Sequence, residues 1–160
     1  MNLWIWFQAI SFQVIWLATV LGGNRWLWIP LCILLLHFTL SPRCRQDLQV
    51  LLLAFVGITT DIMLTQLGFF KFDEWPLWLL VLWFAFVLNF GHSLIFLRRL
   101  PLAWLALIGA LGGCSAYLAS WKLGAVEFPY DLWVTSGVLL AVWAMILPVL
   151  IKADFYLRKE

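Results

Sequence analysis

Two residues of this 160-residue sequence, Asp61 and His92, stand inside long apolar runs and could exchange a proton there. A carboxylate and an imidazole are common general acids and bases, and ionisable groups in apolar surroundings are rare because burying them is costly. We therefore predict Asp61 and His92 as candidate catalytic residues. Structural alternatives stay open: Asp61 could be a protonated hydrogen-bonding partner of Gln13 or Thr65, and His92 could be a hydrogen-bonded interior histidine.

Amide and hydroxyl groups in the apolar runs could orient a ligand by hydrogen bonding. The candidate binding residues are Gln13, Asn89, Ser93 and Tyr117. Asn89, His92 and Ser93 lie three and four positions apart, so a continuous helix would place them on one inward face.

Two histidines and one aspartate also suggest a two-His, one-carboxylate iron site. The helical rise of about 1.5 Å per residue, however, places Asp61 about 12 Å above His37 and His92, too far to share an ion. The sequence contains no GxSxG elbow, no HExxH motif and no glycine-rich phosphate loop. We therefore predict no metal and no cofactor.

The amino-acid composition indicates the class of protein that holds these candidate residues. Hydrophobic residues make up 65% of the sequence and charged residues 11%, whereas soluble domains are roughly 25% charged. The sequence predicts an all-α fold, a polytopic membrane helix bundle in a single domain over residues 1–160. With about 20 residues for each span, the chain has room for about six transmembrane helices. The predicted spans are about 3–21, 26–40, 48–70, 75–97, 101–121 and 132–151.

Lysine and arginine residues between the predicted spans set the expected orientation, because basic residues are enriched on the cytoplasmic side. One side carries seven: Arg43, Arg45, Arg98, Arg99, Lys152, Arg158 and Lys159. The other side carries three: Arg25, Lys71 and Lys122. Both termini are therefore expected in the cytoplasm. Asp47 is expected in a loop and the charges of the tail in solvent. Because the basic residues are scattered rather than gathered in a patch, we expect no nucleic-acid partner.

Small residues at helical spacing predict close helix packing. Gly57 lies one turn before Asp61, and Gly109 and Gly113 form a GxxxG pattern. We predict all three glycines as packing positions, where another backbone can approach closely.

Several separated segments also carry a family resemblance: Phe12-Gln13 to Trp16, the span with Asp61, Asn89 to Leu94, and Gly112-Gly113 to Tyr117 leading into Leu123-Gly124-Ala125-Val126. Together they resemble an uncharacterised bacterial family of small inner-membrane proteins, the domain-of-unknown-function family twenty-eight seventy-eight, over nearly the whole chain. Two features differ from the family pattern. Phe90-Gly91 separate Asn89 from His92, which are adjacent in the family, and Cys114 replaces a common proline.

The resemblance implies a multi-pass protein of the bacterial inner membrane and brings no established activity. Members are often encoded near genes for fatty-acid modification, which implies lipid handling. Our preferred hypothesis is that the polar interior binds, or helps modify, a membrane lipid or other amphiphile. A proton-coupled small-solute transporter that uses Asp61 and a structural subunit that packs through Gly109 and Gly113 are the alternatives. We expect the lipid bilayer as a partner, and the sequence identifies no protein partner.

Overall fold

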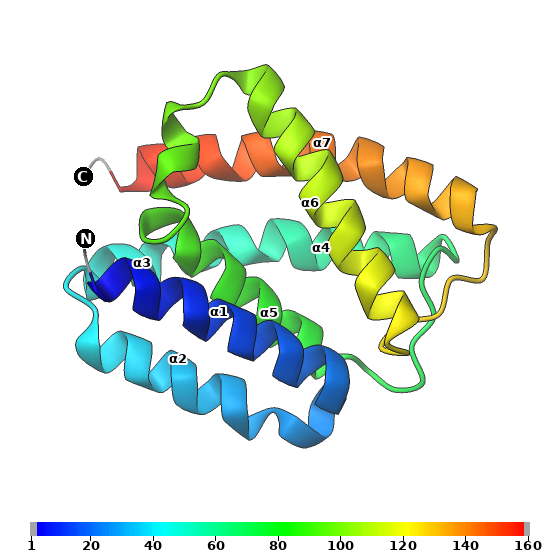
Figure 1. Ribbon diagram of the computed structural model, residues 1–160, viewed down its shortest axis with the longest axis horizontal. Coiled ribbons are helices and arrows are strands. Elements are labelled where there is room, and N and C mark those ends of the chain that lie inside the picture. The colour runs from blue at the N-terminus through cyan, green and yellow to red at the C-terminus, as the bar shows by residue number, and fades with distance from the viewer. Residues whose placement is uncertain (1–2, 159–160) are drawn as a thin grey trace.

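The computed structural model describes residues 3–158 and folds them into helices joined by short loops (Figure 1). The α-helices are α1 (Leu3–Gly22), α2 (Trp28–Leu40), α3 (Cys44–Val50), α4 (Ala54–Gln66), α5 (Leu77–Leu88), α6 (Leu102–Lys122) and α7 (Leu132–Leu157). Four 3-10 helices connect them: η1 (Gly23–Trp26), η2 (Leu51–Leu53), η3 (Asn89–Gly91) and η4 (Ile95–Arg99). The all-helical prediction is confirmed. Lys159, counted above among the basic residues, lies outside the described residues.

Four continuous helical segments are long and apolar enough to cross a membrane: Leu3–Trp26, Cys44–Gln66, Leu102–Lys122 and Leu132–Leu157. Two further apolar helices, Trp28–Leu40 and Leu77–Gly91, are shorter. Since η2 continues α3 into α4, Asp47 lies in a helix and not in the predicted loop. The structure thus has four full-length apolar helices and two short ones where the sequence predicts six spans.

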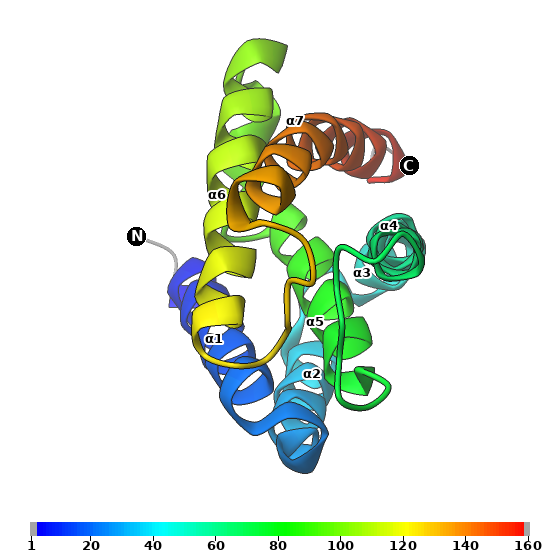
Figure 2. The same ribbon diagram turned by 90° about the vertical axis from the view of Figure 1, so that its right-hand side faces the viewer.

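Helix α5 occupies the middle of the bundle, with α1 and α2 on one side and α4 on the other (Figure 2). All twelve of its residues are apolar, which is typical of a helix surrounded by other apolar groups. Trp78, Trp83, Val87 and Leu88 are buried. This burial explains how a helix too short to span a bilayer by itself can lie inside the molecule.

The helix predicted to continue to Leu97 instead breaks after α5. His92 has φ −125° and ψ −96°, outside the helical region. The predicted common helical face of Asn89, His92 and Ser93 is therefore wrong, although the Ser93 hydroxyl still donates to Asn89 Oδ1 at 2.5 Å. Non-helical backbone at membrane depth is tolerated where protein surrounds it, and Asn89, Gly91 and His92 are all buried.

Helix α6 packs along α7 and crosses it obliquely (Figure 1). Gly109 and Gly113 make this approach possible: a Cβ on Gly109 would lie 2.4 Å from the Trp143 carbonyl oxygen, and one on Gly113 2.0 Å from the Trp143 ring. A Cβ on Gly57 of α4 would likewise lie 2.3 Å from the indole of Trp83. At each of the three glycines, a neighbouring helix therefore leaves no room for a side chain.

Candidate functional site

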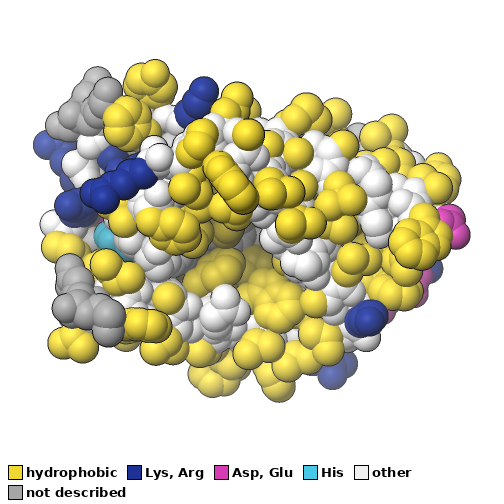
Figure 3. All heavy atoms as spheres, turned by 45° about the horizontal axis from the view of Figure 1, so that its top comes forward, with side chains coloured by type: hydrophobic (Ala, Val, Ile, Leu, Met, Phe, Trp, Pro, Cys, Tyr) yellow, Lys and Arg dark blue, Asp and Glu magenta, His cyan; other side chains and the backbone are white. Residues whose placement is uncertain are grey.

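A cavity of about 730 Å³ lies between α1, α5 and α6 and reaches α7. Figure 3 shows a hollow in an apolar surface, with most of the visible Lys and Arg side chains towards the left end of the molecule and a few at the right end. Apolar and aromatic side chains dominate the cavity wall, among them Phe12, Trp16, Phe86 and Trp143. Ligand sites of proteins commonly have this size and this apolar character, with a few polar groups that fix orientation.

All four predicted binding residues line this one cavity: Gln13, Asn89, Ser93 and Tyr117. The Gln13 side chain is exposed and makes no hydrogen bond to another residue within 3–158. Its amide stands in the middle of α1, one of the apolar helices long enough to cross a membrane. A polar side chain in such a position gains most from a polar partner brought by a ligand or by water.

Asp61, one of the two predicted catalytic residues, lies directly behind the cavity wall. Tyr117 Oη donates to Asp61 Oδ1 at 2.6 Å, and Trp83 Nε1 donates to Asp61 Oδ2 at 2.5 Å. Both aromatic residues line the cavity, whereas Asp61 is only 5% exposed. Neither expected partner binds the carboxylate, because the Thr65 hydroxyl donates to the Asp61 backbone carbonyl and Gln13 points into the cavity region.

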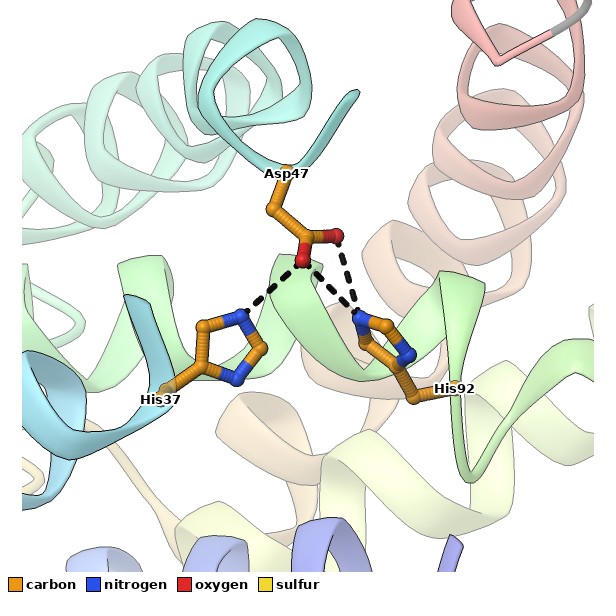
Figure 4. Close-up of side chains that lie close together, drawn as sticks. All are labelled: His37, Asp47 and His92. Carbon is orange, nitrogen blue, oxygen red and sulfur yellow. Dashed lines mark hydrogen bonds and ion pairs between the residues drawn. The ribbon is translucent and has the colours of Figure 1, made fainter. Parts of the chain in front are cut away.

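His92, the other predicted catalytic residue, belongs to a different cluster, centred on the fully buried Asp47 (Figure 4). His37 Nε2 lies 3.2 Å from Asp47 Oδ2, and His92 Nε2 lies 3.0 Å from Asp47 Oδ1. Arg158 Nη1 donates to Asp47 Oδ1 at 2.7 Å, and the Ser41 hydroxyl donates to Asp47 Oδ2. The structure therefore does not bring Asp61 and His92 together.

The neighbours of the two Nδ1 atoms show which nitrogen of each imidazole carries the hydrogen. Trp4 Nε1 donates to His92 Nδ1 at 2.9 Å, and an indole N–H is a donor only. The Gln8 amide nitrogen lies 2.8 Å from His37 Nδ1 in the same arrangement. Each Nδ1 is thus an acceptor, so each Nε2 carries the hydrogen and donates it to Asp47.

These hydrogen bonds determine whether His37, Asp47 and His92 could bind a metal ion. The ligand atoms of His37, Asp47 and His92 all lie within 4.8 Å of one another, close enough for an ion. A metal would, however, need the Nε2 lone pairs, which requires Nδ1–H groups that face acceptors. Trp4 offers a donor to His92 instead, and Arg158 already pairs with the carboxylate. The residues present fit a closed hydrogen-bonded cluster rather than a metal centre.

A second buried carboxylate extends the cluster towards the end of α7. Asp154 accepts from Arg158 Nε at 2.8 Å and from Arg98 Nε at 2.9 Å. Two carboxylates therefore face two guanidinium groups, and the cluster ties α2, α3, the chain after α5 and α7 together. The expectation that the charges of the tail face solvent is wrong for Asp154 and Arg158, which are 0% and 8% exposed.

Asp47 is the residue that sequence reasoning missed. The sequence did contain a signal, because Asp47 lies at helical spacing from the apolar residues Val50 and Ala54 and so shares their helix face. In the structure all three are 0% exposed. Asp154 and Arg158 carry a similar signal, since a pair four residues apart on a helix can form an ion pair.

Four helices long and apolar enough to cross a membrane, with an apolar cavity between helices, are typical of a helical membrane protein. Residues 5–149 match the family model described as a protein of unknown function, DUF2878, and the chain belongs to this family. Comparisons with curated proteins and with solved structures found no match.

Proposed function

We propose that this protein crosses the bacterial inner membrane six times and binds a membrane-derived amphiphile in the cavity between α1, α5 and α6. The cavity carries the proposal: it has the size of a ligand site, its wall is mostly apolar, and four separated polar residues line it. An acyl chain would find apolar contacts along the aromatic wall, and Gln13 would face the polar part of the molecule.

The outer surface supports a position in the bilayer. Large apolar side chains point outwards from almost every helix: Leu17 on α1, Leu35 on α2, Met63 on α4, Leu111 on α6 and Met145 on α7. A soluble protein rarely exposes apolar surface of this extent.

We further propose that both termini face the cytoplasm. Helix α1 begins and α7 ends at the same end of the bundle (Figure 1), and most of the Lys and Arg side chains visible in Figure 3 lie towards that end. The enrichment of basic residues on the cytoplasmic side of membrane proteins assigns that end to the cytoplasm. The Asp47 cluster would then lie near the cytoplasmic surface.

The proposal includes binding and no chemical step. Asp61 and His92 are 5% exposed each, and each is engaged by its own neighbours. Proton-coupled transport would need Asp61 to reach solvent alternately, and the two aromatic donors that enclose it give no support for that alternative.

The test is to fill the cavity without disturbing the fold. Gly112 lines the cavity, and a Cβ placed on it meets nothing within 4 Å, so Gly112→Leu adds a side chain to the empty space. Gly137 on α7 is a matched control, because it is also helical, meets nothing within 4 Å and does not line the cavity.

Both variants and the wild type would be purified in a mild detergent, and co-purified lipid would be measured by mass spectrometry. We expect Gly112→Leu to lose bound lipid by about tenfold, which corresponds to about 1.4 kcal/mol of binding free energy, while Gly137→Leu retains it. Equal amounts of the same lipid in all three samples would refute binding in this cavity.

A further inference from the structure

We infer that the ligand of this cavity carries an uncharged, hydroxyl-bearing headgroup, such as that of a diacylglycerol, and that anionic phosphate headgroups are disfavoured. This inference rests on the proposed function, since it specifies the chemistry of the amphiphile that the cavity takes.

The first observation is the absence of charge in the cavity wall. None of the described residues that line it is Lys, Arg, His, Asp or Glu. Arg98, which directly follows the lining residue Leu97, pairs with Asp154. A phosphate placed in this cavity would lose its hydration without gaining a cation, which is strongly unfavourable.

The second observation concerns the serine hydroxyls of the wall. Ser93 donates to Asn89 Oδ1 at 2.5 Å, Ser115 to the Gly112 carbonyl at 2.9 Å and Ser120 to the Ala116 carbonyl at 2.9 Å. Each hydroxyl hydrogen is used within the protein, so each serine presents its oxygen as an acceptor. Such oxygens attract a ligand that donates a hydrogen bond, and they repel an anionic oxygen.

The third observation is that two hydrogen-bond donors of the cavity wall are turned to Asp61. Tyr117 Oη and Trp83 Nε1 both bind this carboxylate, although their rings line the cavity. Gln13 also lines the cavity, with an exposed amide that offers both a donor and an acceptor. A hydroxyl is likewise both a donor and an acceptor, so it can pair with Gln13 and still donate to a serine oxygen.

The experiment compares two lipids that differ only in the phosphate. Dioleoylglycerol and dioleoylphosphatidic acid have the same acyl chains, and each would be added to the purified full-length protein for native mass spectrometry. We expect the wild type to bind dioleoylglycerol about tenfold more strongly, and Gly112→Leu to lose that binding. Gln13→Leu should reduce the binding of dioleoylglycerol, and Gln13→Lys should shift the preference towards phosphatidic acid, because it places a cation in the wall.

The outcomes separate the two proposals. If phosphatidic acid binds as well as dioleoylglycerol, and Gly112→Leu removes both, the cavity binds amphiphiles and the inferred headgroup is wrong. The headgroup inference also fails if Gln13→Lys leaves the preference unchanged. If Gly112→Leu changes the binding of neither lipid and retains all co-purified lipid, the proposed function itself fails.

Discussion

The protein contains two buried carboxylate sites that solve the same physical problem differently. Asp47 accepts hydrogen bonds from His37, His92, Ser41 and Arg158, and it does not line the cavity between α1, α5 and α6. Asp61 accepts from two neutral aromatic donors and lies behind the wall of a large cavity. The first carboxylate is compensated by the Arg158 cation, whereas the two side chains that donate to the second, Trp83 and Tyr117, are neutral.

This difference separates a fold-stabilising cluster from a ligand-binding region. Breaking a buried ion pair leaves an uncompensated charge, which costs more than losing a neutral hydrogen bond. Changes in the Asp47 cluster should therefore reduce stability strongly, and changes around the cavity should act mainly on ligand binding.

The largest effect is expected for Asp47→Ala. This change leaves Arg158 and two imidazoles without their shared acceptor and should lower the free energy of unfolding by about 3–5 kcal/mol. Thermal or denaturant unfolding in detergent measures it. Asp73→Ala removes an exposed carboxylate and is the control, with an expected change within about 0.5 kcal/mol. If the two variants unfold alike, the cluster does not stabilise the fold.

Gly91→Ala should have the next largest effect. A Cβ at Gly91 would lie 2.3 Å from Arg158 Cζ, so the guanidinium group must move away from Asp47. We expect a loss of about 1–3 kcal/mol in unfolding measurements, typical of overpacking. Gly137→Ala, where nothing obstructs the added methyl group, should be neutral or slightly stabilising. Equal stability of the two variants would show that the chain after α5 adapts freely.

A moderate effect is expected for Asp61→Ala. Trp83 and Tyr117 lose their acceptor, which should cost about 1–3 kcal/mol of stability. Lipid binding should persist, because Asp61 does not line the cavity. Unfolding and lipid-binding measurements on the same preparation check both statements. Complete loss of lipid binding in a folded Asp61→Ala protein would show that Asp61 takes a direct part in binding. Tyr117→Phe, which removes only the hydrogen bond from Tyr117, would then show whether binding depends on that bond or on the one from Trp83.

The smallest effect is expected from metals. Because Trp4 donates to His92 Nδ1, zinc or iron should neither raise the unfolding temperature nor remain bound at one ion per chain after dialysis. Elemental analysis of the wild type and His92→Ala should give equal metal contents. A bound ion that disappears in His92→Ala would overturn the hydrogen-bonded description of the cluster.

Several features were predictable from the sequence because they follow from local chemistry. The apolar runs predict helices, and the structure confirms an all-helical fold with four segments long enough to cross a membrane. Polar residues within apolar runs indicate interior sites, and Gln13, Asn89, Ser93 and Tyr117 do line one cavity. The helical break at His92 was not predictable in this way, since Phe90-Gly91 continue an apolar pattern.

The sequence by itself determined the class of protein: hydrophobicity and helical periodicity act over short stretches and need no distant partner. Only the tertiary structure decided that the two histidines meet Asp47 and not Asp61. Position along a helix estimates the depth of a residue, but the partner across the bundle depends on which face each helix turns inward. The cavity likewise depends on the tertiary structure, because it forms where α6 packs along α7 and leaves space beside α1 and α5.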